Sequence, residues 1–142
     1  MLLLTNTYSK LQLVTTKDLP TDVTSSWIGS NGVLGQDTMR VDKAGITVIV
    51  SSPTGNNQRR VSNLFIINRS TSTGQTIKVR HSDTTPQATS TVEYIEAVLL
   101  PGYTLSYNDS IGFNLYNEKG EVITTGNIGP TGYTGYTGPT GY

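Results

Sequence analysis

His81 is the only histidine in the chain, so it is the first residue to consider as a catalytic base. A histidine acts in this way when a nucleophile and an orienting carboxylate lie within hydrogen-bond reach. The sequence has no nucleophile elbow, phosphate loop, dinucleotide fingerprint or His-Glu-x-x-His motif that would supply such partners. His81 instead continues the apolar face of the alternating segment 76–81. We therefore expect a packing or hydrogen-bonding role for His81, no catalytic residue and no enzymatic activity.

The acidic residues show no motif for catalysis or metal binding. Glu93 and Glu96 are expected on opposite faces of a strand, so they would not form a paired carboxylate site. Asp83 and Asp109 lie near asparagines, and such oxygen ligands suit calcium, but the spaced Asp/Asn/Gly loop of a calcium site is missing. Aspartates in turns account for them better. The sequence predicts no metal and no cofactor.

Two groups of residues could bind a ligand. Arg59 and Arg60 could grip a carboxylate or a phosphate, although we favour solvated ends of a hairpin or a rim contact with a neighbouring subunit. Trp27 stands among glycines and is either a ligand platform or, as we prefer, an anchor in the core or at a subunit interface. A platform for sugar rings would combine this tryptophan with three tyrosines, Tyr103, Tyr107 and Tyr116.

Glycine occupies every third position at the end of the chain. A strict period of three is typical of the collagen triple helix, because only glycine fits where three polyproline-II strands meet. The alternative is a flexible Gly/Thr/Tyr linker, which has no reason to keep this phase. We predict a homotrimer whose triple-helix axis is lined by six glycines, Gly126, Gly129, Gly132, Gly135, Gly138 and Gly141.

So short a repeat needs help to trimerise. Ordering the backbone costs roughly 1 to 2 kcal/mol per residue, and each inter-chain hydrogen bond returns only about 1 kcal/mol net. A folded domain must therefore hold three chains in register. We expect a domain over residues 1–124 and a collagen-like repeat over residues 125–142.

The segments before the repeat alternate between apolar and polar residues and contain many β-branched and aromatic residues. Segment 91–100 also fits a helical stripe, but its residue types favour a strand. Segment 61–67 ends in an apolar run that predicts a central strand covered on both faces. Seven or eight short strands with polar turns predict an all-β fold, an antiparallel β-sandwich of jelly-roll or immunoglobulin-like topology. The predicted strands lie in residues 11–15, 46–50, 61–67, 76–81, 91–100, 103–107, 111–116 and 121–124.

Composition narrows the range of partners. Charged residues make up 14% of the chain, and ten basic side chains balance ten acidic ones. A surface with so little positive charge binds phosphate backbones poorly, so we expect no nucleic-acid partner. No apolar run is long enough for a secretory leader or a membrane-spanning helix, so we expect no membrane insertion. Since the chain has no cysteine, it has neither disulfides nor thiolate metal sites.

Five patches of the chain have sequences that can be compared with known proteins. They are residues 1–5 (MLLLT), 9–15 (SKLQLVT), 58–69 (QRRVSNLFIINR), 99–107 (LLPGYTLSY) and 111–120 (IGFNLYNEKG). In these patches the chain resembles small virion proteins of tailed bacteriophages, which carry a β-sandwich followed in many members by collagen-like Gly-x-Thr triplets. Residues 17–43 match little of this group. The resemblance implies a structural part of the particle, located in the virion, with capsid, portal or tail proteins as partners, and no catalytic residues.

Three functions follow as hypotheses. The first is a trimeric fibre base, decoration protein or tail-associated module, whose β domain docks on the particle and whose triple helix projects as a fibre. The second is a module that binds a host-surface glycan at a tail or fibre tip through the aromatic residues named above. The third, a virion-bound hydrolase, would need a carboxylate pair or a nucleophile in a pocket.

Overall fold

The computed structural model describes residues 1–85 and 87–123, and all regular elements in these residues are β-strands. The all-β prediction is therefore confirmed for this part of the chain. Residues 1–85 and 87–123 contain eleven strands, where seven or eight were predicted. They are β1 (Leu2–Leu4), β2 (Ser9–Thr15), β3 (Thr21–Gly29), β4 (Leu34–Val41), β5 (Gly45–Val50), β6 (Arg59–Asn68), β7 (Gln75–Thr84), β8 (Thr89–Leu99), β9 (Thr104–Asn108), β10 (Gly112–Tyr116) and β11 (Val122–Ile123).

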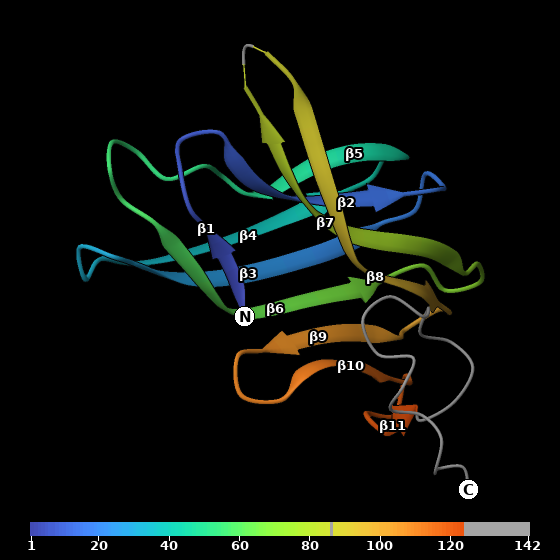
Figure 1. Cartoon of the computed structure of the whole chain (residues 1–142). Helices are drawn as coiled ribbons and strands as arrows, with labels where there is room; N and C mark the ends of the chain where they lie inside the picture. The colour runs from blue at the N-terminus through green and yellow to red at the C-terminus, as the bar shows by residue number, and fades with distance from the viewer. Residues whose placement is uncertain (86, 124–142) are drawn as a thin grey trace, which may run out of the picture.

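The strands form two antiparallel sheets (Figure 1). Sheet A has the order β11-β10-β9-β6-β3-β4, with β1 also paired to β6, and sheet B has the order β5-β2-β7-β8. Both sheets contribute to one apolar core, which is consistent with the predicted β-sandwich. The largest fully buried core side chains are Leu4, Leu11, Leu13, Val23, Ile49, Leu64, Ile66, Ile77, Ile95, Leu99, Leu105 and Leu115.

Each predicted strand is present, and alternation explains its orientation. In β7, Ile77 and Val79 are fully buried, whereas Lys78 and Arg80 between them remain partly exposed. Residues 91–99 of the ambiguous segment 91–100 lie in β8, so the strand interpretation is confirmed and the helical one is wrong. Its register explains the choice, because β8 pairs with β7 along ten residue pairs from Gln75↔Leu99 to Thr84↔Thr89.

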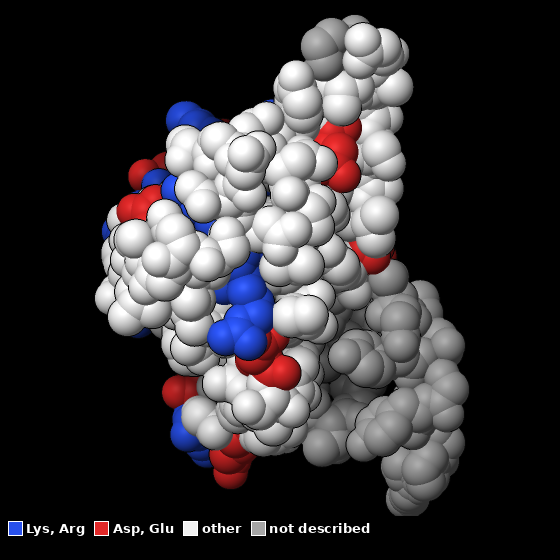
Figure 2. All heavy atoms as spheres, turned by 60° about the vertical axis from the view of Figure 1, so that its left-hand side comes forward, with Lys and Arg blue, Asp and Glu red and all other residues white. Residues whose placement is uncertain are grey.

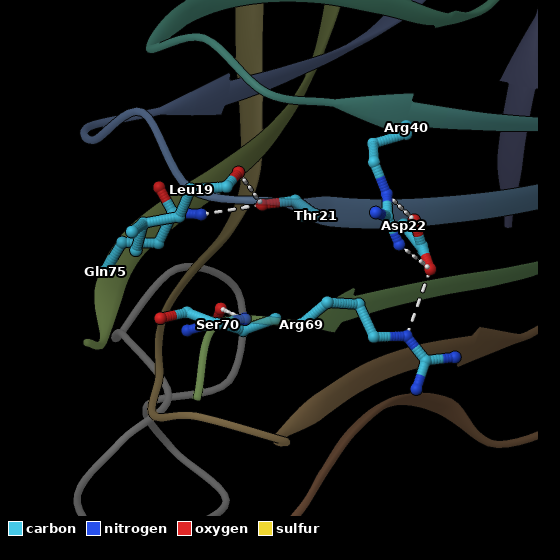
Figure 3. Close-up of polar contacts among 8 residues, drawn as sticks. Leu19, Thr21, Asp22, Arg40, Arg69, Ser70 and Gln75 are labelled. Carbon is cyan, nitrogen blue, oxygen red and sulfur yellow. Dashed lines mark hydrogen bonds and ion pairs between the residues drawn. The ribbon is translucent and has the colours of Figure 1, made fainter. Parts of the chain in front are cut away.

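The sequence did not predict β1, nor did it predict β3 and β4, which lie within residues 17–43. The inner face of β3 carries Thr21 and Ser25 as well as Val23. Because two of these buried residues are polar, the sequence of β3 lacks the apolar–polar alternation that predicts a strand. Both polar side chains are hydrogen-bonded inside the core. Ser25 Oγ donates to the carbonyl of Ile49 (3.2 Å), and Gln75 Nε2 donates to Thr21 Oγ1 (2.8 Å; Figure 3). These bonds offset the cost of burying the polar groups.

Strand β6 is central, as predicted, but it is not covered on both faces. It pairs with β3 on one side and with β9 and β1 on the other. Leu64 and Ile66 point into the core, whereas Phe65 between them is 44% exposed. The prediction of two covered faces is wrong because sheet B packs on only one face of sheet A, and an apolar run cannot distinguish these cases.

The described residues contain no helix that is long and apolar enough to span a bilayer. The six repeat glycines lie outside the described residues, which end at Ile123 of β11. The predicted domain over residues 1–124 therefore falls almost entirely in the described part of the chain, and the predicted repeat over residues 125–142 falls outside it.

Candidate functional site

Trp27 is packed between two neighbours and is not a free platform. It is half-buried against the core. Its ring lies over Gly35, the directly opposite residue on β4. The guanidinium carbon of Arg59 is 4.9 Å from the ring centroid, a cation–π distance. Arg59 is itself held by Ser51, since its Nη1 donates to the carbonyl (2.9 Å) and to the hydroxyl (2.8 Å) of that residue.

The three tyrosines proposed for sugar stacking do not share a surface. Tyr107 is 4% exposed, and its hydroxyl accepts from the amide of Leu2 (3.1 Å) and donates to Asp109 Oδ1 (2.9 Å). Tyr103 is half-buried and packs against the same core. Tyr116 pairs with Thr104 and Val122, which places it on the outer face of sheet A. The structure therefore does not bring these tyrosines together with Trp27.

His81 lies beside Asp83, Ser9 and Tyr94. Its Nε2 is 3.2 Å from Asp83 Oδ1, but this nitrogen makes no hydrogen bond, so the contact is an unaligned approach. Ser9 Oγ donates to the same carboxylate oxygen at 2.6 Å and is fully buried. A serine nucleophile needs its proton taken by the histidine, with the carboxylate behind the ring. Here the carboxylate lies between serine and histidine, so the arrangement does not activate Ser9.

Tyr94 forms the other side of this cluster. Its ring is parallel to that of His81, with an interplanar angle of 2° and centroids 6.4 Å apart. Burial raises the pKa of Tyr94 above its usual value, and the negative charge of Asp83 raises this pKa further. The phenol therefore stays neutral, and the cluster packs the start of β2 against β7 and β8.

The prediction that Glu93 and Glu96 lie on opposite faces of a strand is wrong. The register of β7 and β8 shifts between Val79 and Arg80, so Arg80 pairs with Glu93 and Lys78 pairs with Glu96. The extra residue of this β-bulge interrupts the alternation, so both glutamates lie on the outer face of sheet B. Lys78 Nζ is 3.5 Å from Glu93 Oε1. The glutamates thus face cations and do not form a catalytic pair.

Asp22 accepts three hydrogen bonds from two arginines (Figure 3). Arg40 of β4 binds it through two hydrogen bonds, Nε to Oδ1 at 2.7 Å and Nη2 to Oδ2 at 3.0 Å. Arg69, directly after β6, donates from Nε to Oδ2 at 3.0 Å. The hydrogen bond from Arg40, with that from Arg69, holds the pKa of Asp22 below its usual value of 3.8 against the opposing effect of burial. This network ties β3 to its two neighbouring strands at the sheet surface.

Arg59 and Arg60 do not converge on one ligand. Arg60 lies opposite Leu3 on the outer face of sheet A, and its Nε is 3.3 Å from Asp109 Oδ2. Arg59 belongs to the other face of β6, where it covers Trp27. Groups of three or more His, Cys, Asp or Glu side chains that could hold a metal ion are absent from residues 1–85 and 87–123. The predicted absence of a metal or cofactor stays a prediction.

Two shallow hollows open on the outer face of sheet A. The larger, about 260 Å³, is lined by Leu3, Ile28 and Arg60 of one cross-strand row, with Gly29, Ser30 and Gln58. The smaller, about 170 Å³, is lined by Phe65 with Thr24, Ser25, Ser26, Gln36 and Asn63. Neither lining includes a carboxylate or a histidine. These shallow hollows can therefore contact a surface or a neutral ligand, but they hold no acid–base pair.

Sequence reasoning missed Phe65 as a functional candidate. It treated the residue as part of a buried run, whereas strict alternation of Leu64, Phe65 and Ile66 in a sheet covered on one face would have exposed it. Searches against protein-family models, curated proteins and solved structures find no match to this chain. Its function must therefore be inferred from its own residues.

Proposed function

We propose that the chain is a non-enzymatic structural subunit of a phage particle, assembled as a homotrimer. The two-sheet domain docks on the particle, and the glycine repeat forms a collagen-like triple helix that projects as a fibre. The protein acts as a fibre base, decoration protein or tail-associated module. Its partners are two further copies of itself and the capsid, portal or tail protein on which the domain sits.

One observation carries this proposal. Strand β11 ends at Ile123 on the edge of sheet A, and the first glycine of the repeat, Gly126, follows three residues later. Three residues reach at most about 11 Å. If the repeat is a triple helix, the β11 edges of three copies must meet close to one axis. The folded domains then hold the three chains in the register that so short a repeat requires.

The side-chain chemistry of the domain supports a non-enzymatic role. His81 and Asp83 pack β2 against β7 and β8, and neither hollow is lined by a carboxylate or a histidine. The resemblance to virion proteins of tailed phages supports a location in the virion. Such a particle is assembled in the host cytoplasm, and its fibres face the outside.

A second candidate is binding of a host-surface glycan. Phe65 is exposed in the smaller hollow beside Asn63 and Gln36. An exposed ring flanked by amides is the arrangement that stacks on a sugar and hydrogen-bonds its hydroxyls. This site differs from the Trp27 and tyrosine platform that the sequence suggested.

The experiment is to measure the mass of the full chain in solution and the protease sensitivity of its tail. We expect a trimer with a protected tail. In Gly132→Val, a branched side chain at the axis frays the triple helix, so the tail is digested faster while the domain keeps its β-type circular dichroism. Thr131→Val, at a position that points away from the axis, is the matched control. A monomeric wild type whose tail is digested as fast as that of Gly132→Val would overturn the proposal.

A further inference from the structure

We infer that the outer face of sheet A is the surface through which three copies of this chain contact one another around the triple-helix axis. This inference rests on the proposed function and adds to it the part of the domain that makes the trimer. It depends on the distribution of charge over the two outer faces and on the place of β11 in sheet A.

Two cross-strand rows form the centre of this face, and neither contains a charged residue. The register defines both rows, because directly opposite residues of neighbouring strands share a face. Phe65, 44% exposed, lies in the middle of the first row. The first row is Thr38, Thr24, Phe65, Ser106 and Asn114, and the second is Gln36, Ser26, Asn63, Asn108 and Gly112.

Charged residues lie at the borders of these rows and are paired within the chain. On one side, Asp22 binds Arg40 and Arg69. On the other side, Arg60 lies 3.3 Å from Asp109. Protein interfaces have the same anatomy, with few charges at the centre and a polar, solvated rim. Figure 2, which brings the left-hand side of Figure 1 forward, shows charged residues in small groups with uncharged surface between them.

The outer face of sheet B differs. Its rows carry Lys78 and Arg80 of β7 beside Glu93 and Glu96 of β8. Exposed apolar residues are present there too, including Val48 at 39%, but they lie beside this charged band. Bringing three such faces together would desolvate those charges, and the free-energy cost of desolvation often exceeds the gain from Coulomb attraction. Sheet A is therefore the better candidate for a shared surface.

The occupant of this face follows from where the repeat begins. A further row of the same face runs from Ile67 through Thr104 and Tyr116 to Val122 of β11, which is 51% exposed. The face is thus continuous with the strand that enters the glycine repeat after Ile123. A surface that adjoins the triple-helix axis meets the corresponding surfaces of the other two copies, so the occupant is a second and third copy of this chain.

The test uses the full chain with single substitutions, measured by sedimentation equilibrium. Phe65→Lys puts a charge at the centre of the face. Asn63→Asp adds a charge without changing the shape of the side chain. In the wild type, Asn108 Nδ2 donates to Asn63 Oδ1 at 3.0 Å, and the aspartate keeps this acceptor. Val48→Lys, at a similar exposure on sheet B, is the matched control. We expect both sheet A variants to weaken trimerisation at least tenfold with unchanged circular dichroism, and Val48→Lys to trimerise as the wild type does.

A second readout uses the absence of cysteine from the chain. In the trimer, a thiol introduced as Phe65→Cys should react with a maleimide at least tenfold more slowly than one introduced as Val48→Cys. A trimeric wild type whose Phe65→Lys variant trimerises as tightly as Val48→Lys, with equal labelling of the two cysteines, would overturn the inference alone and leave the face free for a glycan. A monomeric wild type would overturn the proposed function and this inference together.

Discussion

Trp27 of β3 covers Gly35, the residue directly opposite it on β4. A Cβ atom on Gly35 would lie 2.2 Å from Cε2 of the Trp27 ring, far inside van der Waals contact. The glycine is therefore required by its neighbour, because the indole takes the space of a side chain. The edge strand β4 is held to the sheet partly by this contact.

We predict that Gly35→Ala destabilises the domain by about 1 to 3 kcal/mol, the usual cost of overpacking. Chemical denaturation followed by the fluorescence of Trp27, the only tryptophan, measures this cost. In a Trp27→Leu background, where circular dichroism replaces fluorescence, Gly35→Ala should cost clearly less. An equal cost in both backgrounds would show that the ring does not impose the glycine.

The hydrogen bonds of Asp22 to two arginines make the free energy of unfolding depend on pH. The folded-state pKa of Asp22 is lowered, so its contribution is present above the ordinary pKa of 3.8 and is lost as the pH falls through the folded value. Because the network is partly exposed, we expect Asp22→Asn to cost less than about 1 kcal/mol at pH 7 and nothing measurable at pH 2. Urea denaturation at the two pH values gives this difference.

Asp18→Asn is the control for that experiment. Asp18 is 62% exposed and lies 3.9 Å from Lys43 Nζ, a loose surface pair. Its Oδ1 also accepts from the amide of Ala44 (2.8 Å), a bond that the side-chain oxygen of asparagine can accept too. Because Lys43 lies farther from Asp18 than Arg40 lies from Asp22, this substitution should cost less than Asp22→Asn at pH 7. If Asp22→Asn and Asp18→Asn behave alike at pH 7, the two arginines do not stabilise the fold through Asp22.

Tyr107→Phe tests the buried hydroxyl that links the first strand to the core. Its loss leaves the amide of Leu2 without the acceptor at 3.1 Å and removes the donor to Asp109. An unsatisfied buried donor costs about 1 to 3 kcal/mol. Thermal unfolding should show this loss for Tyr107→Phe and a smaller change for Tyr116→Phe on the outer face. Equal changes would contradict the role of the hydroxyl.

Asn68, the last residue of β6, links the loop before β7 to the end of β8. It is fully buried, and its Nδ2 donates to the carbonyls of Thr73 and Leu99, both at 2.9 Å. Asn68→Asp keeps the shape but turns this donor into an oxygen that faces two carbonyl oxygens. We expect a loss of about 3 to 5 kcal/mol at pH 7, as for an unpaired buried charge. Asn56→Asp, in the exposed loop between β5 and β6, should cost much less in the same denaturation assay.

Alternation in the sequence determined most strands of this protein. Ile77 and Val79 alternate with Lys78 and Arg80. This period of two gives β7 one apolar and one polar face, whichever element packs on the apolar face. The glycine period likewise predicts a triple helix from local geometry alone, because it depends only on which residue fits at a crowded axis. Local patterns of this kind need no knowledge of distant residues.

The tertiary structure decided everything that depends on a partner far away in the chain. Thr21 and Ser25 are tolerated inside β3 because Gln75 and Ile49 supply hydrogen bonds from other strands. Phe65 is exposed because sheet B covers only the other face of sheet A. Glu93 and Glu96 share a face because a bulge opposite β7 shifts the register. Pairing, bulges and layer packing are set by the chain as a whole, so only the folded arrangement decides which residues meet.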